Sequence, residues 1–264
     1  GTGGFSNKAL SVGAYNSPYF EVVIGVFMLL FGINFNVYFF LLIRHFKEAF
    51  ACEEMRVYLG VIAASTLAVA GNIFHLYGNV WQSLRYSFFQ VASIITTTGY
   101  ATTDFNMWPT FSKAVLVLLM FFGACAGSTG GGIKTTTFFV LLSGIYSAAT
   151  NHSERAFHSA IPKDAFRKAS VISMLAVFLV MTASYLMLIF DPQLSLRDVL
   201  FEMISAFSTS GLSTGITPQL SAQSRILSII MMYIGRLGPL TVASLWYFTI
   251  GERVRYPEGT IAIG

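Results

Sequence analysis

The stretch SLRYSFFQVASIITTTGYAT (residues 83–102) recurs 112 residues later as SLRDVLFEMISAFSTSGLST (residues 195–214). Aligned without gaps, the two windows of 20 residues share eight identities: Ser83/Ser195, Leu84/Leu196, Arg85/Arg197, Phe89/Phe201, Ser93/Ser205, Thr97/Thr209, Gly99/Gly211 and Thr102/Thr214. A repeat on this scale indicates one supersecondary unit that the chain uses more than once.

Each copy predicts a short helix, at about residues 81–95 and 195–207, followed by an elbow rich in Thr, Ser and Gly. Such a helix is too short to span a bilayer, which needs about 20 apolar residues. Apolar segments that are long enough flank both copies. Irregular backbone at membrane depth is tolerated only where it is buried in protein or lines a wet cavity. The layout therefore predicts a pore-lining unit.

The elbows carry no charge, so they offer a cation only backbone carbonyls and hydroxyls. These oxygens replace the hydration shell of K⁺ in a selectivity filter. Glycine is expected there because lining up carbonyls needs backbone angles that a Cβ disfavours. The first residues of the chain align with both elbows, which makes Gly4, Gly99 and Gly211 equivalent. The predicted ion-binding residues are Thr2, Gly3, Gly4, Phe5, Thr97, Thr98, Gly99, Tyr100, Thr209, Ser210, Gly211 and Leu212.

The composition is that of a polytopic membrane protein. Of 264 residues 55% are apolar and 11% charged, and the mean hydropathy is +0.66, whereas soluble domains are about 25% charged. We expect both cysteines, Cys52 and Cys125, to be free. No Ser/His/Asp set, carboxylate pair or metal-ligand spacing predicts an active site, a transition-metal site or a cofactor.

Five segments predict membrane crossings: residues 20–43, 57–77, 111–149, 169–190 and 226–250, the third interrupted near its middle. Loops on one side hold nine Lys and Arg residues and those on the other side five. Because the more positive side faces the cytoplasm, the outer loops that follow the elbows are expected outside the cell.

The interruption in residues 111–149 is the motif AGSTGGG, followed by Ile133 and Lys134. It nearly matches the phosphate-binding pattern GxxxxGK[ST], but Ile133 shifts the spacing by one residue, and an apolar helix rather than a strand precedes it. One interpretation is a kink where small residues let helices approach closely. The other is a gating loop, because each Gly weakens a helix by about 1 kcal/mol relative to Ala.

Two cations fall inside apolar segments. Arg236 at mid-depth costs at least about 2.5 kcal/mol, so it needs a partner or a role. It can pair with an acid or with carbonyls at a helix contact, and it can set a barrier to cations below the filter; the two interpretations are compatible. Lys134 either snorkels to the inner surface or takes part in gating. The candidate gate comprises Ala126, Gly127, Ser128, Thr129, Gly130, Gly131, Gly132, Lys134 and Arg236.

Three motifs in this order resemble the Trk/Ktr family of microbial K⁺ uptake proteins: TTTGYATTDFNMWP (residues 96–109), CAGSTGGGIKTTT (residues 125–137) and IGRLGPLT (residues 234–241). The tail RYPEGTIAIG (residues 255–264) is similar to the Ktr branch. The resemblance implies an all-α membrane fold like that of K⁺ channels, with four helix–pore-helix–helix repeats around one pore. Its filter glycines map onto Gly4, Gly99 and Gly211, and its inner Arg onto Arg236.

The resemblance also implies that this chain is the C-terminal part of a four-repeat protein. Residues 1–55 would end repeat two, 56–150 would form repeat three, and 151–264 repeat four with a cytoplasmic tail. The implied cargo is K⁺, and the implied partners are membrane lipid, a second copy in a homodimer, and a cytoplasmic nucleotide-binding ring. No nucleic acid is implied.

We therefore interpret the chain as part of a K⁺ uptake subunit of the plasma membrane and not as an enzyme. A Na⁺-permeable or Na⁺-coupled transporter of the same fold stays open, because a Ser in the first filter favours Na⁺ in related plant transporters. An ATP-hydrolysing membrane enzyme that uses residues 128–134 and a non-conducting regulatory subunit are further alternatives.

Overall fold

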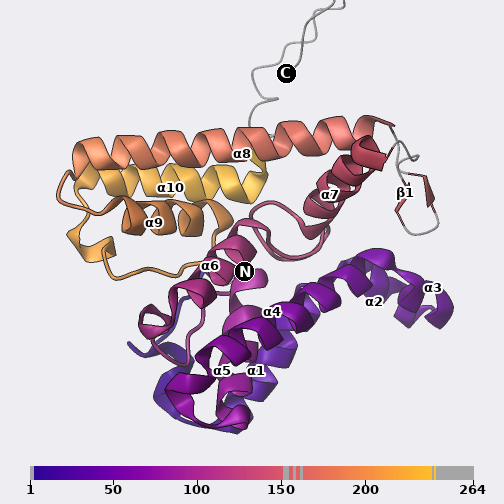
Figure 1. Cartoon of the computed structure of the whole chain (residues 1–264), viewed down its shortest axis with the longest axis horizontal. Helices are drawn as coiled ribbons and strands as arrows, with labels where there is room; N and C mark the ends of the chain where they lie inside the picture. Colours follow the sequence, from indigo (N-terminus) through magenta and orange to yellow (C-terminus); the bar gives the residue numbers. More distant parts are fainter. Residues whose placement is uncertain (1–2, 151–154, 157–158, 161–162, 240, 242–264) are drawn as a thin grey trace, which may run out of the picture.

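The computed structural model describes residues 3–150, 155–156, 159–160, 163–239 and 241 (Figure 1). The predicted filter residue Thr2 and the tail motif at residues 255–264 lie outside this part. The helices are α1 (Pro18–Phe31), α2 (Phe35–Leu42), α3 (Phe46–Ala51), α4 (Glu53–Tyr77), α5 (Val80–Ile95), α6 (Thr110–Phe121), α7 (Thr135–Thr150), α8 (Lys163–Phe190), α9 (Leu196–Ser208) and α10 (Ala222–Leu237). Strands β1 (Arg155–Ala156) and β2 (Ser159–Ala160) form a short antiparallel pair.

Helices α4 and α8 are long and apolar enough to cross a membrane, which confirms the crossings predicted at residues 57–77 and 169–190. The crossing predicted at residues 20–43 is not one continuous helix: α1 and α2 are together long and apolar enough for a span, but they meet at 92°. The bend lies at Gly32, where an added Cβ would meet the Tyr58 hydroxyl and come within 2.9 Å of the Thr96 methyl group. Asn34 then starts α2 by accepting a hydrogen bond from the amide of Asn36.

The predicted interruption of residues 111–149 is confirmed, since α6 ends at Phe121 and α7 begins at Thr135. The last predicted crossing, at residues 226–250, is helical through α10, which ends where Gly238 takes a φ of +91°. Residues 242–264 lie outside the described part of the chain.

Both predicted short helices are confirmed as α5 and α9, each with a capped start. The side chain of Asn79 accepts the amide of Trp81 at the start of α5, and the Ser195 hydroxyl accepts that of Asp198 at the start of α9. Capping of this kind satisfies amides that have no partner inside the helix. The last turn of α5 is buried all round, as expected for a helix in the interior of a bundle.

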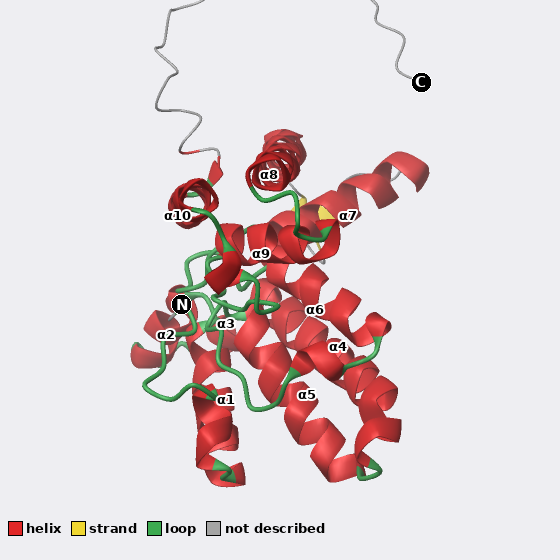
Figure 2. Cartoon of the chain, turned by 90° about the vertical axis from the view of Figure 1, so that its left-hand side faces the viewer, coloured by secondary structure: helices red, strands yellow, loops and turns green. Residues whose placement is uncertain are grey.

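The helices form two packed groups that α6 joins (Figures 1 and 2). Helices α8, α9 and α10 pack on one another, while α4 and α1 pack on α5. Helix α6 contacts α4, α5 and α9. Between the groups, the ring of Phe105 stacks on that of Phe201 with centroids 5.6 Å apart and planes 18° apart. This arrangement brings the residues that follow α5 close to those that follow α9.

An ion pair lies where α1 packs on α5. Arg85 Nε lies 2.9 Å from an oxygen of Glu21, and the two side chains are only 13% and 5% exposed. The two groups are close enough for an ion pair but are not aligned as a hydrogen bond. Removing one partner of a buried pair leaves an uncompensated charge, which costs about 3–5 kcal/mol.

We therefore expect Glu21→Gln and Arg85→Gln each to lower the thermal unfolding temperature of the purified protein, and the double variant to lose less than the sum of the two. Unfolding temperatures of the four forms in one detergent test this. Strictly additive losses would show that Glu21 and Arg85 do not stabilise each other.

Candidate ion filter and gating loop

The elbows after α5 and α9 have the same backbone conformation. Thr97 and Gly99 have φ values of +54° and +82°, and the equivalent Thr209 and Gly211 have +57° and +80°. In each elbow the amide of the residue before the glycine bonds back to the preceding helix: Thr98 N donates to Ser93 O at 2.8 Å, and Ser210 N to Ser205 O at 3.0 Å. The sequence repeat is thus also a repeat of local geometry.

Left-handed backbone at a threonine is unfavourable by roughly 1–2 kcal/mol. Each elbow therefore has a strained backbone position, at Thr97 and at Thr209. The surrounding hydrogen bonds hold it in place. The Thr96 hydroxyl donates to Ala92 O at 2.6 Å, and the Ser93 hydroxyl donates to Tyr100 O at 2.6 Å. These bonds tie the elbow to the last turn of α5 and leave its conformation little freedom.

Carbonyls from equivalent positions in three segments form a cyclic arrangement. Thr98 O accepts a hydrogen bond from Gly4 N at 2.7 Å. Ser210 O lies against Gly99, and Gly3 O lies against Gly211, each where an added Cβ would overlap it. A Cβ on Gly4 would lie 2.9 Å from Gly211 O and 3.0 Å from Gly99 O. The three predicted glycines are therefore brought together, and each lies where a side chain does not fit.

The last residue of each predicted filter segment lies outside this ring of carbonyls and glycines. Phe5 is 85% exposed, and Leu212 is buried in the core cluster around α4 and α5. Tyr100 contributes its carbonyl to the bond with Ser93 instead of to the ring. The structure thus concentrates the contacts between segments at the glycine of each elbow and the residue before it.

The loop between α6 and α7 lies directly against both elbows. Gly131 N donates to the Thr97 hydroxyl at 3.0 Å. A Cβ on Gly131 would overlap Ser208 O and the Thr209 hydroxyl. Gly123 N donates to Ile133 O at 2.7 Å, which draws the two ends of the loop together. Most of the predicted gate residues therefore form one compact loop next to the filter segments.

The bend between α1 and α2 holds the opposite side of this loop. Cys125 N donates to Gly32 O at 3.2 Å, and Phe35 N donates to Gly127 O at 3.1 Å. The Thr129 hydroxyl donates to Phe31 O at 3.2 Å. The break in α1–α2, which the sequence did not reveal, thus supplies unpaired backbone groups that the loop satisfies, as buried backbone requires.

Both predicted cations bind carbonyls of the loop. Arg236 Nη1 donates to Thr129 O at 2.7 Å, and Lys134 Nζ donates to Gly130 O. Gly235 allows this approach, because a Cβ there would overlap Phe207 O at the end of α9. Of the two structural interpretations of Arg236, contact with carbonyls is the one observed. Its barrier role stays a prediction.

Glu54 and Asn34 belong to the site and were missed from the sequence. Glu54 Oε1 accepts Ala126 N at 2.6 Å, and Glu54 Oε2 accepts the amide of Asn34 at 3.0 Å. Asn34 was the available signal, since it is polar inside an apolar run. Nothing in the sequence spacing pointed from Glu54 to a loop 72 residues later.

The helix ends at the elbows favour a cation, and the loop does not offer a phosphate cradle. The C-terminal ends of α5 and α9, which carry partial negative charge, lead straight into the elbows. Glu202 of α9 and Arg225 of α10 line a cavity of about 310 Å³ together with Gly3 and Gly211. A phosphate cradle needs free backbone amides, but Gly131 N is bound to Thr97 and Lys134 is bound to Gly130 O. This geometry does not fit a nucleotide site at residues 128–134.

Comparison with known proteins gives consistent results. A family profile described as "TrkH: Cation transport protein" matches residues 77–248. The chain is 32% identical over 282 residues to Ktr system potassium uptake protein D of Bacillus subtilis, covering 99% of this chain and 61% of the relative. It is 29% identical over 258 residues to Ktr system potassium uptake protein B of the same organism, covering 94% and 57%.

Over 144 residues, or 53% of this chain and 29% of the relative, it is 38% identical to Trk system potassium uptake protein TrkH of Salmonella typhimurium. The crystal structure of the potassium transporter TrkH from Vibrio parahaemolyticus superposes with a TM-score of 0.83 at 23% identity, covering 92% of this chain and 55% of that one. The chain thus spans about half to three fifths of the length of its Ktr relatives.

The solved structure supports the predicted helical, channel-like membrane fold, and the profile covers most of the elements that build the elbows and the loop. Its family consists of membrane transporters and not of enzymes. The chain is therefore a multi-pass protein of the cell membrane that belongs to the TrkH family of cation transport proteins.

Proposed function

We propose that this chain is part of a subunit that takes up K⁺ across the cytoplasmic membrane through backbone carbonyls. The observation that carries the proposal is the cyclic contact of equivalent carbonyls and glycines from three segments. Relatives that are named potassium uptake proteins support the choice of K⁺. The transported ion is the cargo, and the proposal includes no cofactor.

In this proposal a fourth segment completes the filter. The Ktr relatives are longer than this chain, so such proteins have further residues that could supply it. A fourth segment would insert between two of the three segments whose glycines, Gly4, Gly99 and Gly211, are in contact in this structure. The carbonyls of Gly3, Thr98 and Ser210 would then face a shared axis, where they could replace the hydration shell of an ion.

The loop at residues 126–132 would act as the gate. It lies against the elbows on one side and is bound by Arg236 and Lys134 on the other. Both cations neutralise carbonyls that would otherwise attract an ion. Opening would require these bonds to break, and Glu54 would keep one end of the loop anchored at Ala126.

The repeat boundaries at residues 1–55, 56–150 and 151–264 are part of the proposal, as is an orientation with the elbows' outer loops outside the cell. The matching backbone angles of the two elbows support equivalent units. A homodimer and a cytoplasmic nucleotide-binding ring are the proposed partners.

Uptake of K⁺ and Na⁺ into liposomes that contain the full-length protein, without partner or ATP, tests the function. K⁺ uptake that excludes Na⁺ supports the proposal. Uptake of both ions would favour the Na⁺-permeable alternative. No uptake, even after the regulatory ring is added, would favour a non-conducting subunit.

We expect Gly99→Ser to reduce the K⁺/Na⁺ permeability ratio by about tenfold, because left-handed backbone strain of roughly 1–3 kcal/mol adds to overlap with Ser210 O. The control is Gly215→Ser, where φ is +100° but no atom lies within 4 Å of the added Cβ. Ion flux into liposomes measures both ratios. A ratio that stays unchanged in the Gly99 variant would refute the filter assignment.

We expect Arg236→Ala to raise K⁺ flux in the absence of any activator by about tenfold or more, since a hydrogen bond to a charged group contributes roughly 1.5–3 kcal/mol. Arg236→Gln removes the positive charge but can still donate a hydrogen bond to Thr129 O. We expect it to raise K⁺ flux less than Arg236→Ala does, because the hydrogen bond holds the loop. Lys47→Gln is the control, because it removes an exposed cation of the short helix α3. Equal flux in the Arg236 variants and the unmodified protein would contradict the gating role.

A further inference from the structure

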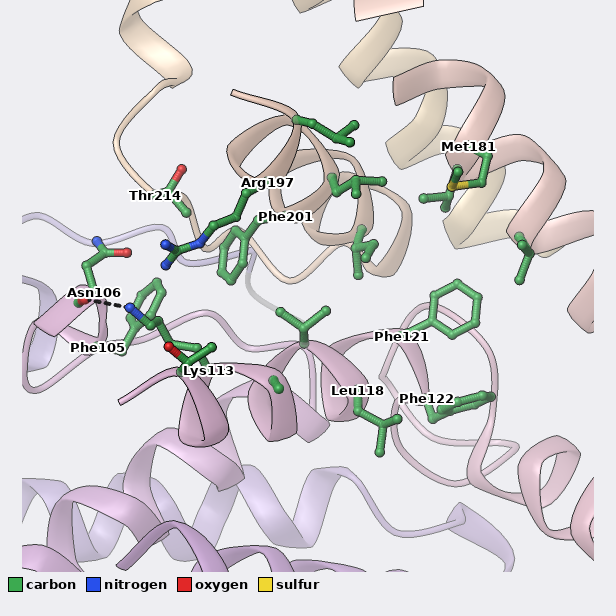
Figure 3. A pocket seen from close by; sticks show the side chains of 18 residues that line it. Phe105, Asn106, Lys113, Leu118, Phe121, Phe122, Met181, Arg197, Phe201 and Thr214 are labelled. Atoms are coloured by element: carbon green, nitrogen blue, oxygen red, sulfur yellow. Dashed lines mark hydrogen bonds between the residues drawn. The ribbon is translucent and has the colours of Figure 1, made fainter. Parts of the chain in front are cut away.

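An apolar groove of about 880 Å³ lies between α6, α8 and α9 (Figure 3). Its walls are mainly aliphatic and aromatic, and several wall residues are open to the surroundings, such as Leu118 at 53% and Val177 at 49% exposure. The volume is within the range of about 300–1,000 Å³ that is common for ligand sites. On helices that lie in a membrane, such a groove faces the acyl chains of lipid.

The groove has polar groups at one end only (Figure 3). Lys113 of α6 and Arg197 of α9 lie there with Asn106 and Thr214. Lys113 Nζ donates to Asn106 O at 3.1 Å. Among the described residues, neither Lys113 nor Arg197 has a carboxylate within ion-pair distance. Two positive charges thus lie at the mouth of an apolar groove without an acid.

The equivalent arginine in the other copy of the repeat has an acid. Arg85 aligns with Arg197 and pairs with Glu21 of α1 at 2.9 Å. Helix α1 packs on α5 as α6 packs on α9. Residues 18–32 and 109–123 also align without gaps, with five identities: Pro18/Pro109, Phe20/Phe111, Val26/Val117, Phe31/Phe122 and Gly32/Gly123. We call the contact of α1 with α5 the first boundary and the contact of α6 with α9 the second boundary. The two can be compared position by position.

In that alignment Ser112 takes the place of Glu21, and Lys113 takes the place of Val22. Ser112 cannot neutralise Arg197, and its hydroxyl is already bound to Asn72 at 2.7 Å. Compared with the first boundary, the second therefore lacks the carboxylate and has an additional cation, Lys113. Arg197 is exposed and Lys113 is half-buried, so both charges are open to a negative group from outside the described residues.

We propose that the groove binds an anionic phospholipid. One acyl chain lies along the apolar walls of α6, α8 and α9, and the phosphate lies at Lys113 and Arg197, in place of the carboxylate that Glu21 supplies at the first boundary. The planar guanidinium of Arg197 can bind two phosphate oxygens at once, and Lys113 adds a point charge. With two cations and no acid, the site selects a headgroup of net negative charge.

The test is lipid retention by the full-length protein, purified in detergent, mixed with equal amounts of phosphatidylglycerol and phosphatidylcholine and analysed by native mass spectrometry. We expect preferential retention of phosphatidylglycerol, and an affinity about tenfold lower in Lys113→Gln/Arg197→Gln. Arg225→Gln, which removes an outer cation away from the groove, should retain it as the unmodified protein does. Equal retention of both lipids, or an unchanged affinity in the double variant, would overturn the proposal.

Two further variants separate lipid binding from misfolding. Ala114→Trp fills the groove without touching either charge and should also lower retention of phosphatidylglycerol. Lys113→Glu replaces one of the two cations at the mouth of the groove by an acid and should abolish the preference for the anionic lipid while keeping the unfolding temperature. If the double variant instead loses a concentration-dependent dimer at unchanged lipid retention, the groove is a contact between copies and the lipid proposal is wrong.

Discussion

The contact between a carbonyl of one segment and the glycine of the next is the constraint on which the other features depend. It recurs at Gly4, Gly99 and Gly211, where a Cβ would lie within 3.0 Å of backbone atoms. Interiors that are packed this closely respond to the addition of a single methyl group. The short helices α5 and α9 serve this contact, because each ends where the next residues must turn into left-handed backbone. Their caps and the bonds from Ser93 and Ser205 set the angle at which they do so.

The loop at residues 122–134 shows how one irregular segment can satisfy several others. Its amides and carbonyls bond to the elbow at Thr97, to the α1–α2 bend at Gly32, and to the cations Arg236 and Lys134. Helix breaks leave amides and carbonyls without partners inside a helix. Here two breaks, one in the α1–α2 segment and one between α6 and α7, supply partners to each other. This pairing explains why irregular backbone is tolerated within an apolar bundle.

The contact of α1 with α5 and the contact of α6 with α9 differ in the surroundings of their aligned arginines. At the first, Arg85 is balanced inside the protein by Glu21. At the second, Arg197 lies at the end of an apolar groove together with Lys113. The difference arises from two adjacent substitutions in otherwise similar helices, Ser112 for an acid and Lys113 for an aliphatic residue. The alignment of α1 with α6 therefore identifies the positions at which the two contacts differ in charge.

The sequence by itself determined the membrane class, the two short helices before the elbows, the three equivalent glycines, the break near residue 126 and the family resemblance. These features follow from local pattern, since helix length, apolar runs and glycine content are properties of neighbouring residues. Only the tertiary structure revealed the 92° bend at Gly32, the anchoring of the loop by Glu54, and the carbonyl partners of Arg236. These depend on contacts between residues that lie far apart in the chain. Residues 20–43 read as one apolar run because hydropathy does not record that Tyr58 and Thr96 occupy the space beside Gly32.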